Sequence, residues 1–447
     1  MIKLSPAASA VIKNLTEAGY AAYAVGGAVR DAILGLPVSD FDVTTSATPT
    51  EVKQALSGYK IFDTGLKHGT VTARVSGENV EITTFRTDGD YLDARKPESV
   101  KFVTDVSVDL SRRDFTMNAV CYNPAEGILD PTGGVEDIRA GVIRAVGDPE
   151  KRFREDALRI LRAVRFASVL GFKIEENTKK AMLKTKDLIG KLSKERVFSE
   201  LKKTLLGDNV KEVLTEYREI FYCVIPELKP CYGFEQKSVY HLTDVFTHIV
   251  SAVAFAPKDI YVRLALLYHD IAKPLCFTVD AAGAGHFKGH AALGAKMAEK
   301  SLKNLKADNF TVQTVEKLVY NHDNYMLSSR ADVLKMLDIE GLDFIRRLTE
   351  LRRADLKAHF TANIGPREKI ADGVLSIAET AVENGECYSL KTLAINGGDL
   401  VVMGFKGETI GKILNRVLNE VRAGSIKNDR AELLNEVKNY GRFRKQN

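Results

Sequence analysis

The sequence predicts an α+β protein in which an N-terminal mixed sheet, packed with helices, precedes a long and largely α-helical remainder. Up to about residue 145, strand-like runs such as 69–75 and 79–86 alternate with helical stretches. Beyond Asp148-Pro149 the apolar spacing becomes helical, with almost no strand signal. These two residue patterns place the sheet in the first third of the chain and helices in the rest.

One helix start in the first part is strongly marked. Thr48 is a capping residue, Pro49 occupies the first helical position, and Glu51 stands three residues after the cap. This arrangement satisfies the free N–H groups at a helix N-terminus. We therefore expect a helix to begin at Pro49.

The length of 447 residues suggests roughly three units at about 150 residues each. Changes in the spacing of apolar residues give finer boundaries. Strand signals end near 145, and the helical stretches that follow differ in composition. The expected segments are a head, a helical neck, a helical body and a C-terminal tail, spanning 1–145, 146–215, 216–390 and 391–447.

Composition narrows the class of protein. The chain has no window near the roughly 20 apolar residues of a membrane helix, and its start lacks the apolar run of a secretory signal. Its five cysteines form no CxxC pair, which favours reduced thiols. A net charge of +5 permits RNA binding without requiring it. We expect a cytoplasmic protein with no membrane partner, and the sequence does not predict its oligomeric state.

Two short motifs near the N-terminus carry chemistry. The turn Gly26-Gly27 ends a strand and opens a helix, which presents backbone N–H groups and Arg30 to a triphosphate. Asp40 and Asp42 follow with the i, i+2 spacing that turns both carboxylates to one face of a strand, where they can share divalent ions. Either motif alone is commonly an ordinary turn or a solvated strand edge. Together they supply the phosphate cradle and the Mg²⁺ ligands of phosphoryl transfer, which indicates a nucleotidyltransferase.

Five ordered motifs resemble those of class II tRNA nucleotidyltransferases and bacterial poly(A) polymerases. They are GGAVRD at 26–31, DFD at 40–42, RRDFTMNAV at 112–120, DPTGG at 130–134 and EDALRILRAVRF at 155–166. The resemblance covers about the first 210 residues and implies a polymerase-β-like head domain. It implies catalytic, Mg²⁺-binding roles for Asp40 and Asp42, and nucleotide binding by Gly27 and Arg30.

Asp156, Arg159, Arg162 and Arg165 recur every three residues and so lie along one broad helical face. The plainer interpretation is an amphipathic helix with arginines on its solvent face. Cytosine and adenine each present an amino donor beside a ring-nitrogen acceptor, and a carboxylate with a guanidinium complements that pattern.

The resemblance implies that Asp156 and Arg159 select CTP and ATP. Arg162 and Arg165 are then placed towards the sugar or the phosphates. The resemblance implies the same contact for Arg113, with Arg112 as a close competitor.

The polar stretch 86–97 contains several turn residues and is expected to form a loop. It is either an ordinary connection or a functional one. In CCA-adding relatives a loop at this place, with basic residues like Arg95 and Lys96, is associated with the switch from C to A. This feature favours addition of the full CCA sequence.

Six of the eight histidines lie between 241 and 322, which indicates a metal site. The order of the cluster resembles the HD phosphohydrolase superfamily over about 241–360. The resemblance implies one metal held by His248, His269, Asp270 and Asp355, with His290 and His322 binding a second ion. The metal would be Ni, Mn, Fe or Co, and the reaction cleavage of phosphoesters such as 2′,3′-cyclic phosphates. The alternative is a body kept only as a tRNA-binding scaffold.

The segments 396–400 and 407–414 resemble the tRNA-contacting tail of the same family, although an ordinary helical cap fits them equally well. Overall the sequence predicts addition of CCA to the 3′ end of tRNA, using CTP, ATP and Mg²⁺. A poly(A) polymerase and an enzyme that adds only A are alternatives. A third alternative is a hydrolase whose first domain merely binds RNA.

Overall fold

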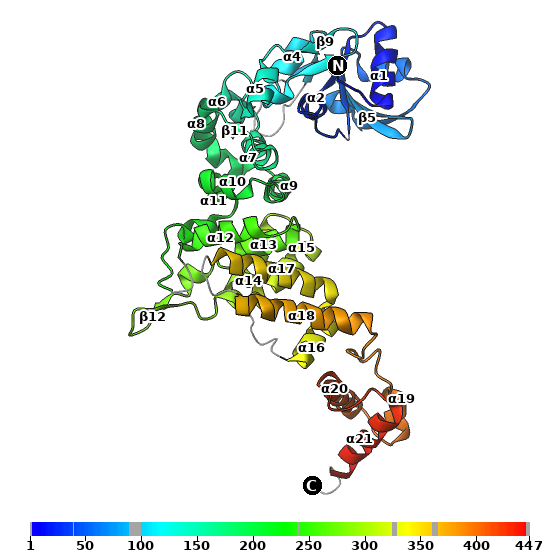
Figure 1. The fold of residues 1–447 in the computed structure, drawn as a ribbon. Helices are drawn as coiled ribbons and strands as arrows, with labels where there is room; N and C mark the ends of the chain where they lie inside the picture. The colour runs from blue at the N-terminus through cyan, green and yellow to red at the C-terminus, as the bar shows by residue number, and fades with distance from the viewer. Residues whose placement is uncertain are drawn as a thin grey trace. The chain divides into compact units, whose positions relative to one another are not determined.

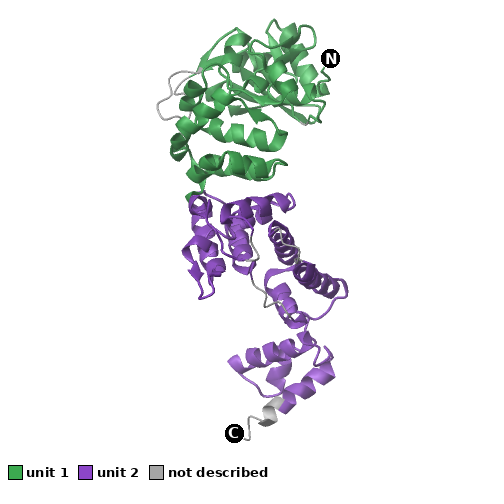
Figure 2. Ribbon diagram, turned by 60° about the vertical axis from the view of Figure 1, so that its left-hand side comes forward, with its two compact units in different colours: residues 1–226 green, residues 227–447 purple. Residues whose placement is uncertain are grey.

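The computed structural model describes residues 2–38, 40–88, 100–238, 242–323, 329–359 and 365–443. Arg95, Lys96 and most of the loop expected at 86–97 lie outside these residues. The chain divides into two compact units, Met1–Pro226 and Glu227–Asn447, which Figure 2 colours separately. The finer division into four segments remains a prediction.

The first unit contains a seven-stranded sheet in the order β3-β4-β5-β2-β1-β8-β9. Its strands are β1 Ala22–Val25, β2 Asp42–Thr45, β3 Lys60–Gly65, β4 Thr70–Val75, β5 Glu78–Thr84, β8 Cys121–Asn123 and β9 Gly127–Leu129. Strands β2 and β5 pair in parallel, whereas the other neighbours pair antiparallel. The predicted α+β class, with a mixed sheet at the N-terminus, is therefore confirmed (Figure 1).

The helices of the sheet region begin where the sequence marks them. They are α1 Pro6–Glu17, α2 Gly27–Ile33, α3 Pro49–Ala55, α4 Val106–Ser111 and α5 Gly134–Ala140. Helix α3 begins at Pro49, and the backbone N–H of Thr48 donates to Glu51 Oε2 at 2.7 Å. Two short strands, β6 Arg86–Asp88 and β7 Val100–Phe102, pair beside the sheet. A core of apolar side chains that includes Tyr23, Phe85 and Leu110 fixes α4 against β1.

The rest of the first unit is helical. Its helices are α6 Pro149–Glu155, α7 Leu158–Leu170, α8 Glu176–Thr185, α9 Lys194–Leu205, α10 Val210–Glu216 and α11 Arg218–Val224. The pair β10 Val142–Ile143 and β11 Lys173–Ile174 is parallel. Helices α7 and α9 pack together, burying Leu161 and Val164 of α7 and Leu201 of α9. This packing sets the predicted base-selecting helix beside a second helix.

The described residues of the second unit form helices and one short hairpin, β12 Thr278–Val279 with β13 Gly285–His286. The helices of the body are α12 Val245–Phe255, α13 Ile260–Tyr268, α14 His290–Asn304, α15 Asn309–Asn321, α16 Arg330–Glu340, α17 Leu342–Ala358 and α18 Gly365–Glu383. None of the described helices combines the length and the apolar character needed to cross a membrane.

The last three helices, α19 Gly397–Val402, α20 Glu408–Arg422 and α21 Arg430–Phe443, share a core of their own. Asn396 caps α19 together with Asp399, and Arg430 Nη2 lies 2.5 Å from Asp399 Oδ1. The segment 396–400 thus has a structural role in holding α19 and α21 together. Its proposed contact with tRNA remains a prediction.

Candidate functional site

The glycine turn lies where the sequence places it, between β1 and α2. Gly26 has φ +78°, a backbone conformation that side chains disfavour, so glycine suits this position. A Cβ added to Gly26 would lie 3.6 Å from Arg113 Nη1, and one added to Gly27 would lie 3.5 Å from Arg30 Nη2. The two arginines therefore stand directly over the glycine turn. Arg30 is buried, and its Nη1 donates to Asn118 at 2.9 Å.

The carboxylates gather at the start of β2. Asp42 is the first residue of this strand, and Asp40 lies two residues before it. Strand β5 pairs in parallel with β2 at Val43 and Ile82, so Glu81 stands beside Asp42. Loss of water around its carboxylate, together with the charges of Glu81 and Asp40, raises the pKa of Asp42 to about 6, although Arg113 opposes this. Crowded carboxylates of this kind stabilise a bound cation.

Glu81 is a residue that sequence reasoning missed. Its signal was weak, since a single acid in the strand-like run 79–86 is an ordinary exposed residue. Only the parallel pairing of β2 with β5, which joins segments about forty residues apart, brings it to Asp42. Glu81 is therefore a third acidic residue close to the predicted pair.

Asp109 holds both arginines of the RRDF motif. This carboxylate is buried, and its oxygens lie 2.7 Å from Arg112 Nη2 and 3.3 Å from Arg113 Nη2. The Nε of Arg112 donates to the backbone carbonyl of Arg86. Arg113 instead reaches the glycine turn and the charge of Asp42. Of the two competitors, Arg113 is thus the one beside the carboxylates.

Asp156 and Arg159 are each fixed by neighbouring groups. Asp156 Oδ1 accepts from the N–H of Leu158 at 3.0 Å, and Oδ2 accepts from Arg196 Nη2 at 2.9 Å. Arg159 is buried and donates to Glu155 Oε2 at 3.1 Å and to the carbonyl of Arg112 at 2.9 Å. These contacts link the predicted base-selecting pair to the RRDF motif and to α9.

Arg162 and Arg165 form a cationic cluster with Arg30 around the ring of Phe166. The guanidinium carbons of Arg165, Arg30 and Arg162 lie 4.2, 5.2 and 5.4 Å from the ring centroid. Arg162 Nη2 is 2.6 Å from Asp114 Oδ2. Although burial alone would raise it, Arg162 lowers the pKa of Asp114 to about 2. Helix α7, which carries Arg162 and Arg165, therefore lies beside Arg30 of α2, the helix that follows the glycine turn.

The second unit brings together all six metal-ligating residues predicted from its sequence. His248 lies on α12, His269-Asp270 follows α13, and Asp355 lies on α17. His248 Nε2 is 2.9 Å from Asp355 Oδ1 and 3.4 Å from Asp270 Oδ2, while His269 Nε2 is 3.2 Å from Asp270 Oδ2. Ligands about 2.1 Å from one ion are separated by roughly 3.0–3.4 Å, as these atoms are.

His290 and His322 form a second group around the other oxygen of Asp270. Their Nε2 atoms lie 3.1 Å apart and stand 3.4 and 3.8 Å from Asp270 Oδ1. Asp270 therefore turns one oxygen towards each group. This is the arrangement of a carboxylate that bridges two ions.

Backbone contacts set the tautomer of these four histidines. The Nδ1 atoms of His269, His290 and His322 lie 2.6–2.8 Å from the carbonyls three residues earlier, and His248 Nδ1 lies 3.3 Å from the carbonyl of Ala358. A carbonyl only accepts, so each Nδ1 carries the hydrogen and each neutral ring presents its Nε2 lone pair to the cluster.

The cluster attracts positive charge. Burial lowers the pKa of His322 to about 3. With no metal ion bound, Asp270 and Asp355 raise the pKa of His269 to about 10 against the effect of burial, so a metal ion would displace a proton from its Nε2. Among the described residues, only histidine nitrogens of the cluster come close to the buried oxygens Asp270 Oδ1 and Asp355 Oδ1. Buried carboxylates of this kind require a cation, so the residues present fit a divalent metal.

A cavity of about 660 Å³ opens onto the cluster. Four cationic side chains line it, namely Lys237, Lys273, Lys288 and Arg367, together with the carboxylates of Asp270, Asp323 and Asp355. Lys273 is buried, with Nζ 2.7 Å from Asp270 Oδ2. A divalent ion at Asp270 and Asp355 would offset these carboxylates, and the cavity would then suit an anionic ligand.

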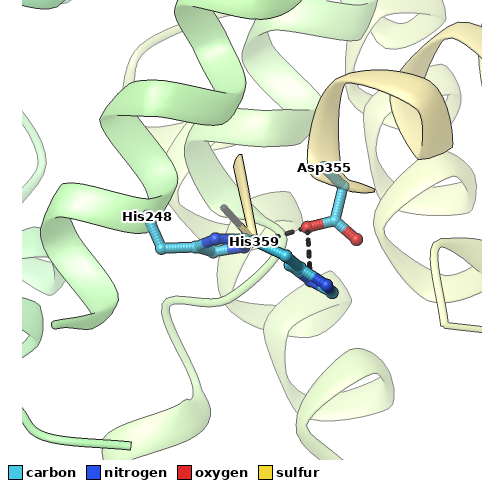
Figure 3. Close-up of side chains that lie close together, drawn as sticks. All are labelled: His248, Asp355 and His359. Atoms are coloured by element: carbon cyan, nitrogen blue, oxygen red, sulfur yellow. Dashed lines mark ion pairs between the residues drawn. The ribbon is translucent and has the colours of Figure 1, made fainter. Parts of the chain in front are cut away.

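His359 also lines this cavity and was missed from the sequence. Figure 3 shows its ring beside Asp355 and His248. It follows Asp355 by four residues at the end of α17, so the helical i, i+4 spacing was the available signal.

Family models match three stretches of the chain. Residues 22–144 match the poly(A) polymerase head domain, 171–231 the RNA-binding site of polymerase A, and 290–437 domain 2 of tRNA nucleotidyltransferases. Fold and site together define a nucleotidyltransferase of the poly(A) polymerase head type.

Curated relatives narrow this class. The CCA-adding enzyme of Ligilactobacillus salivarius is 34% identical over 431 residues, which is 96% of this chain and 95% of that protein. The CCA-adding enzyme of Geobacillus stearothermophilus is 51% identical over 197 residues, 44% of this chain and 48% of that protein. The chain belongs to the CCA-adding enzyme family.

Solved structures agree with this assignment. The crystal structure of the Bacillus stearothermophilus CCA-adding enzyme in complex with CTP has a TM-score of 0.69 and 28% identity, covering 99% of this chain and all of that one. The Thermotoga maritima CCA-adding enzyme in complex with tRNA has a TM-score of 0.57 at 19% identity, covering 97% of this chain and 94% of that one, which shows a shared fold.

Proposed function

We propose that this chain adds CCA to the 3′ end of tRNA, using CTP and ATP and releasing pyrophosphate. The observation that carries the proposal is the position of Arg113, between the glycine turn and the carboxylates of Asp40, Asp42 and Glu81. A relative that this chain covers in full was solved with CTP, and one of the same fold with tRNA, which supports these partners.

Different residues of the head have different roles in nucleotidyl transfer. Gly27, Arg30 and Arg113 would hold the triphosphate, and Asp40, Asp42 and Glu81 would hold Mg²⁺, whose charge would favour ionisation of the terminal 3′-hydroxyl. The 3′ oxygen forms a bond to the α-phosphorus while the bond between the α-phosphorus and the bridging oxygen breaks. Pyrophosphate leaves with that oxygen, and the hydroxyl proton passes to water.

Base selection falls to Asp156 and Arg159. The carboxylate accepts from the amino group of cytosine or adenine, and the guanidinium donates to the ring nitrogen beside it. Glu155 and the carbonyl of Arg112 hold Arg159 in place, while Arg196 holds Asp156. Arg162 and Arg165 bind the phosphates or the sugar, held by Asp114 and Glu200.

Extension of tRNA lacking CCA tests the proposal. The protein is incubated with Mg²⁺ and each labelled nucleotide, singly and in combination, and product length is read on a gel. Three added residues from CTP plus ATP support CCA addition. A long A tract would indicate a poly(A) polymerase, and one added A an enzyme specialised for that step. No extension together with phosphatase activity would indicate a hydrolase whose head only binds RNA.

We propose a second function for the body, a metal-dependent phosphohydrolase. The observation that favours it is the pair of histidine groups around Asp270 beneath a basic cavity. Ni, Mn, Fe or Co bound there would lower the pKa of a water molecule and so supply hydroxide. Lys237, Lys288 and Arg367 would bind the phosphate, and 2′,3′-cyclic phosphates are candidate substrates.

Hydrolysis is tested with the full chain, loaded with each of these metals in turn. A phosphodiester and a phosphomonoester serve as substrates, and Asp270→Ala is compared with the wild type. Metal-dependent cleavage that Asp270→Ala abolishes supports the function. Metal binding without cleavage of any phosphoester would leave the body as a scaffold and contradict it.

A further inference from the structure

His359 lies one helical turn beyond Asp355 and faces the same group of ligands. Its Nε2 is 3.6 Å from Asp355 Oδ1, and its ring centroid is 5.2 Å from that of His248 at a tilt of 39°. Figure 3 shows the two imidazoles flanking the carboxylate, with an ion pair drawn from each. His359 is buried, with 6% of its surface exposed.

The distance between His359 Nε2 and Asp355 Oδ1 distinguishes a hydrogen bond from a pair of ligands that share one metal ion. At 3.6 Å a nitrogen and an oxygen are too far apart for a hydrogen bond. The distance resembles the separations between other ligand atoms of the cluster, which reach 3.8 Å for His322 and Asp270. The ligand atoms of His248, Asp355 and His359 all lie within 4.8 Å of one another, so one ion can contact the three.

The groups around Asp355 Oδ1 also favour a metal ion between this oxygen and the imidazole nitrogens. Three imidazole nitrogens converge on this oxygen, at 2.9 Å from His248, 3.4 Å from His269 and 3.6 Å from His359. His248 and His269 have their Nδ1 hydrogens on backbone carbonyls, so each ring, when neutral, turns its Nε2 lone pair towards the oxygen. Lone pairs facing a carboxylate are stable when a cation lies between them.

We infer that His359 is a fifth protein ligand of the first metal, beside His248, His269, Asp270 and Asp355. This inference rests on the metal site proposed above for the body. It goes beyond the ligand set expected from the sequence, which ends at Asp355.

The inference makes the two metal positions unequal. Five protein ligands leave one open position on a six-coordinate ion, so the first ion is nearly closed. Asp270, His290 and His322 leave several positions on the second ion, and an open position is where water and substrate bind. A phosphate ligand would therefore find more open positions at an ion held by Asp270, His290 and His322. Five nitrogen and oxygen ligands also favour six-coordinate Ni, Co, Fe or Mn over tetrahedral Zn.

Cobalt(II) titration of the metal-free full chain tests the inference. Cobalt shifts the proton resonances of coordinated imidazoles far outside the normal range, so bound histidines can be counted by NMR. The wild type is compared with His359→Ala and His359→Asn. His286→Ala is the matched control, because His286 is exposed, pairs with Asp280 and, although it lines the same cavity, belongs to none of the ligand groups.

Shifted resonances from five imidazoles are expected in the wild type and from four in both His359 variants. The variants should also bind the first cobalt at least about tenfold more weakly, with stronger visible absorption because its coordination number falls. His286→Ala should match the wild type. Equal helical content by circular dichroism in the four metal-free proteins shows that the second unit of each is folded.

Two results would overturn the inference in distinguishable ways. If the wild type binds two cobalt ions but the His359 variants keep its resonances and affinity, His359 is not a ligand and the metal site itself stands. If the wild type binds no cobalt, the inference and the proposed metal site both fail.

Discussion

Arg196 donates to Asp156, with Nη2 2.9 Å from Oδ2, and so ties α9 to the carboxylate proposed to choose the base. The other oxygen of Asp156 accepts from the N–H of Leu158 at the start of α7. Two donors on different helices thus fix the orientation of one carboxylate. Any change in the packing of α9 on α7 would alter the angle at which Asp156 meets the base.

Arg196→Ala should reduce kcat/KM for CTP and ATP about tenfold, because a hydrogen bond to a charged group contributes about 1.5–3 kcal/mol. Use of UTP relative to CTP should rise, since Asp156 is no longer held in one orientation. Arg196→Lys should restore part of the selectivity. Arg154→Ala is the control, as Arg154 pairs with Glu150 on the surface. An unchanged UTP to CTP ratio in Arg196→Ala would contradict the positioning role.

Binding of Mg²⁺ should weaken at acid pH. The pKa of Asp42 is raised to about 6, so the carboxyl gains a proton as the pH falls through that value and must lose it to hold the ion. The Mg²⁺ concentration for half-maximal extension should rise roughly fourfold between pH 7 and pH 5.5. Mg²⁺ titrations at several pH values measure this, and a half-saturation that does not change with pH would refute the role of Asp42.

Asp114→Ala should lower the free energy of unfolding by about 2 kcal/mol at pH 7, less than for a fully buried pair because Arg162 is partly exposed. The pKa of Asp114 is lowered to about 2, so its stabilising contribution is present above about pH 4 and is lost towards pH 2. The difference from the wild type should therefore shrink as the pH falls. Urea denaturation followed by circular dichroism checks this, with Asp63→Ala on edge strand β3 as control.

Gly134→Ala should destabilise the head by about 3 kcal/mol or more. A Cβ at this position would lie 2.1 Å from the carbonyl oxygen of Thr116 and 2.6 Å from Val120. The N–H of Gly134 also donates to Asp130 Oδ1 at 2.7 Å, so these two residues of the DPTGG motif have a structural role. Gly190→Ala, where a Cβ meets nothing within 4 Å, is the control. Equal melting temperatures for the two variants would contradict the close approach.

Metal should stabilise the body. Adding Mn²⁺ or Ni²⁺ to the chelator-treated protein should raise its melting temperature, because a ligand at 100 times its Kd contributes about 2.7 kcal/mol. Asp270→Ala removes the carboxylate that faces both histidine groups, and it should abolish the rise while leaving tRNA extension intact. A rise that persists in Asp270→Ala would place the bound metal elsewhere.

The sequence predicted the features that depend on local pattern. The capping of α3 by Thr48 and Glu51, the mixed sheet and the helical remainder follow from residue spacing and are confirmed. The Gly26-Gly27 turn lies between β1 and α2 as expected. Such features could be predicted because each depends on residues a few positions apart.

The residues that were missed depend on contacts between distant segments. Glu81 reaches Asp42 only through the parallel pairing of β5 with β2, and Arg196 reaches Asp156 only because α9 packs on α7. His359 has the spacing of a ligand, but a lone histidine at i+4 is usually structural. The identity of the bases added likewise follows from the family rather than from the geometry of Asp156 and Arg159.

The most direct test of CCA addition uses three tRNA substrates, ending before the CCA sequence, after its first C and after its second C. Each is incubated with CTP, ATP and Mg²⁺, and the 3′ ends are sequenced, with Asp42→Asn as the inactive control. All three substrates should finish at CCA with wild-type protein and remain unextended with the variant. Extension of only the substrate that ends in CC, or A tracts beyond CCA, would contradict the proposal that this one chain adds all three nucleotides.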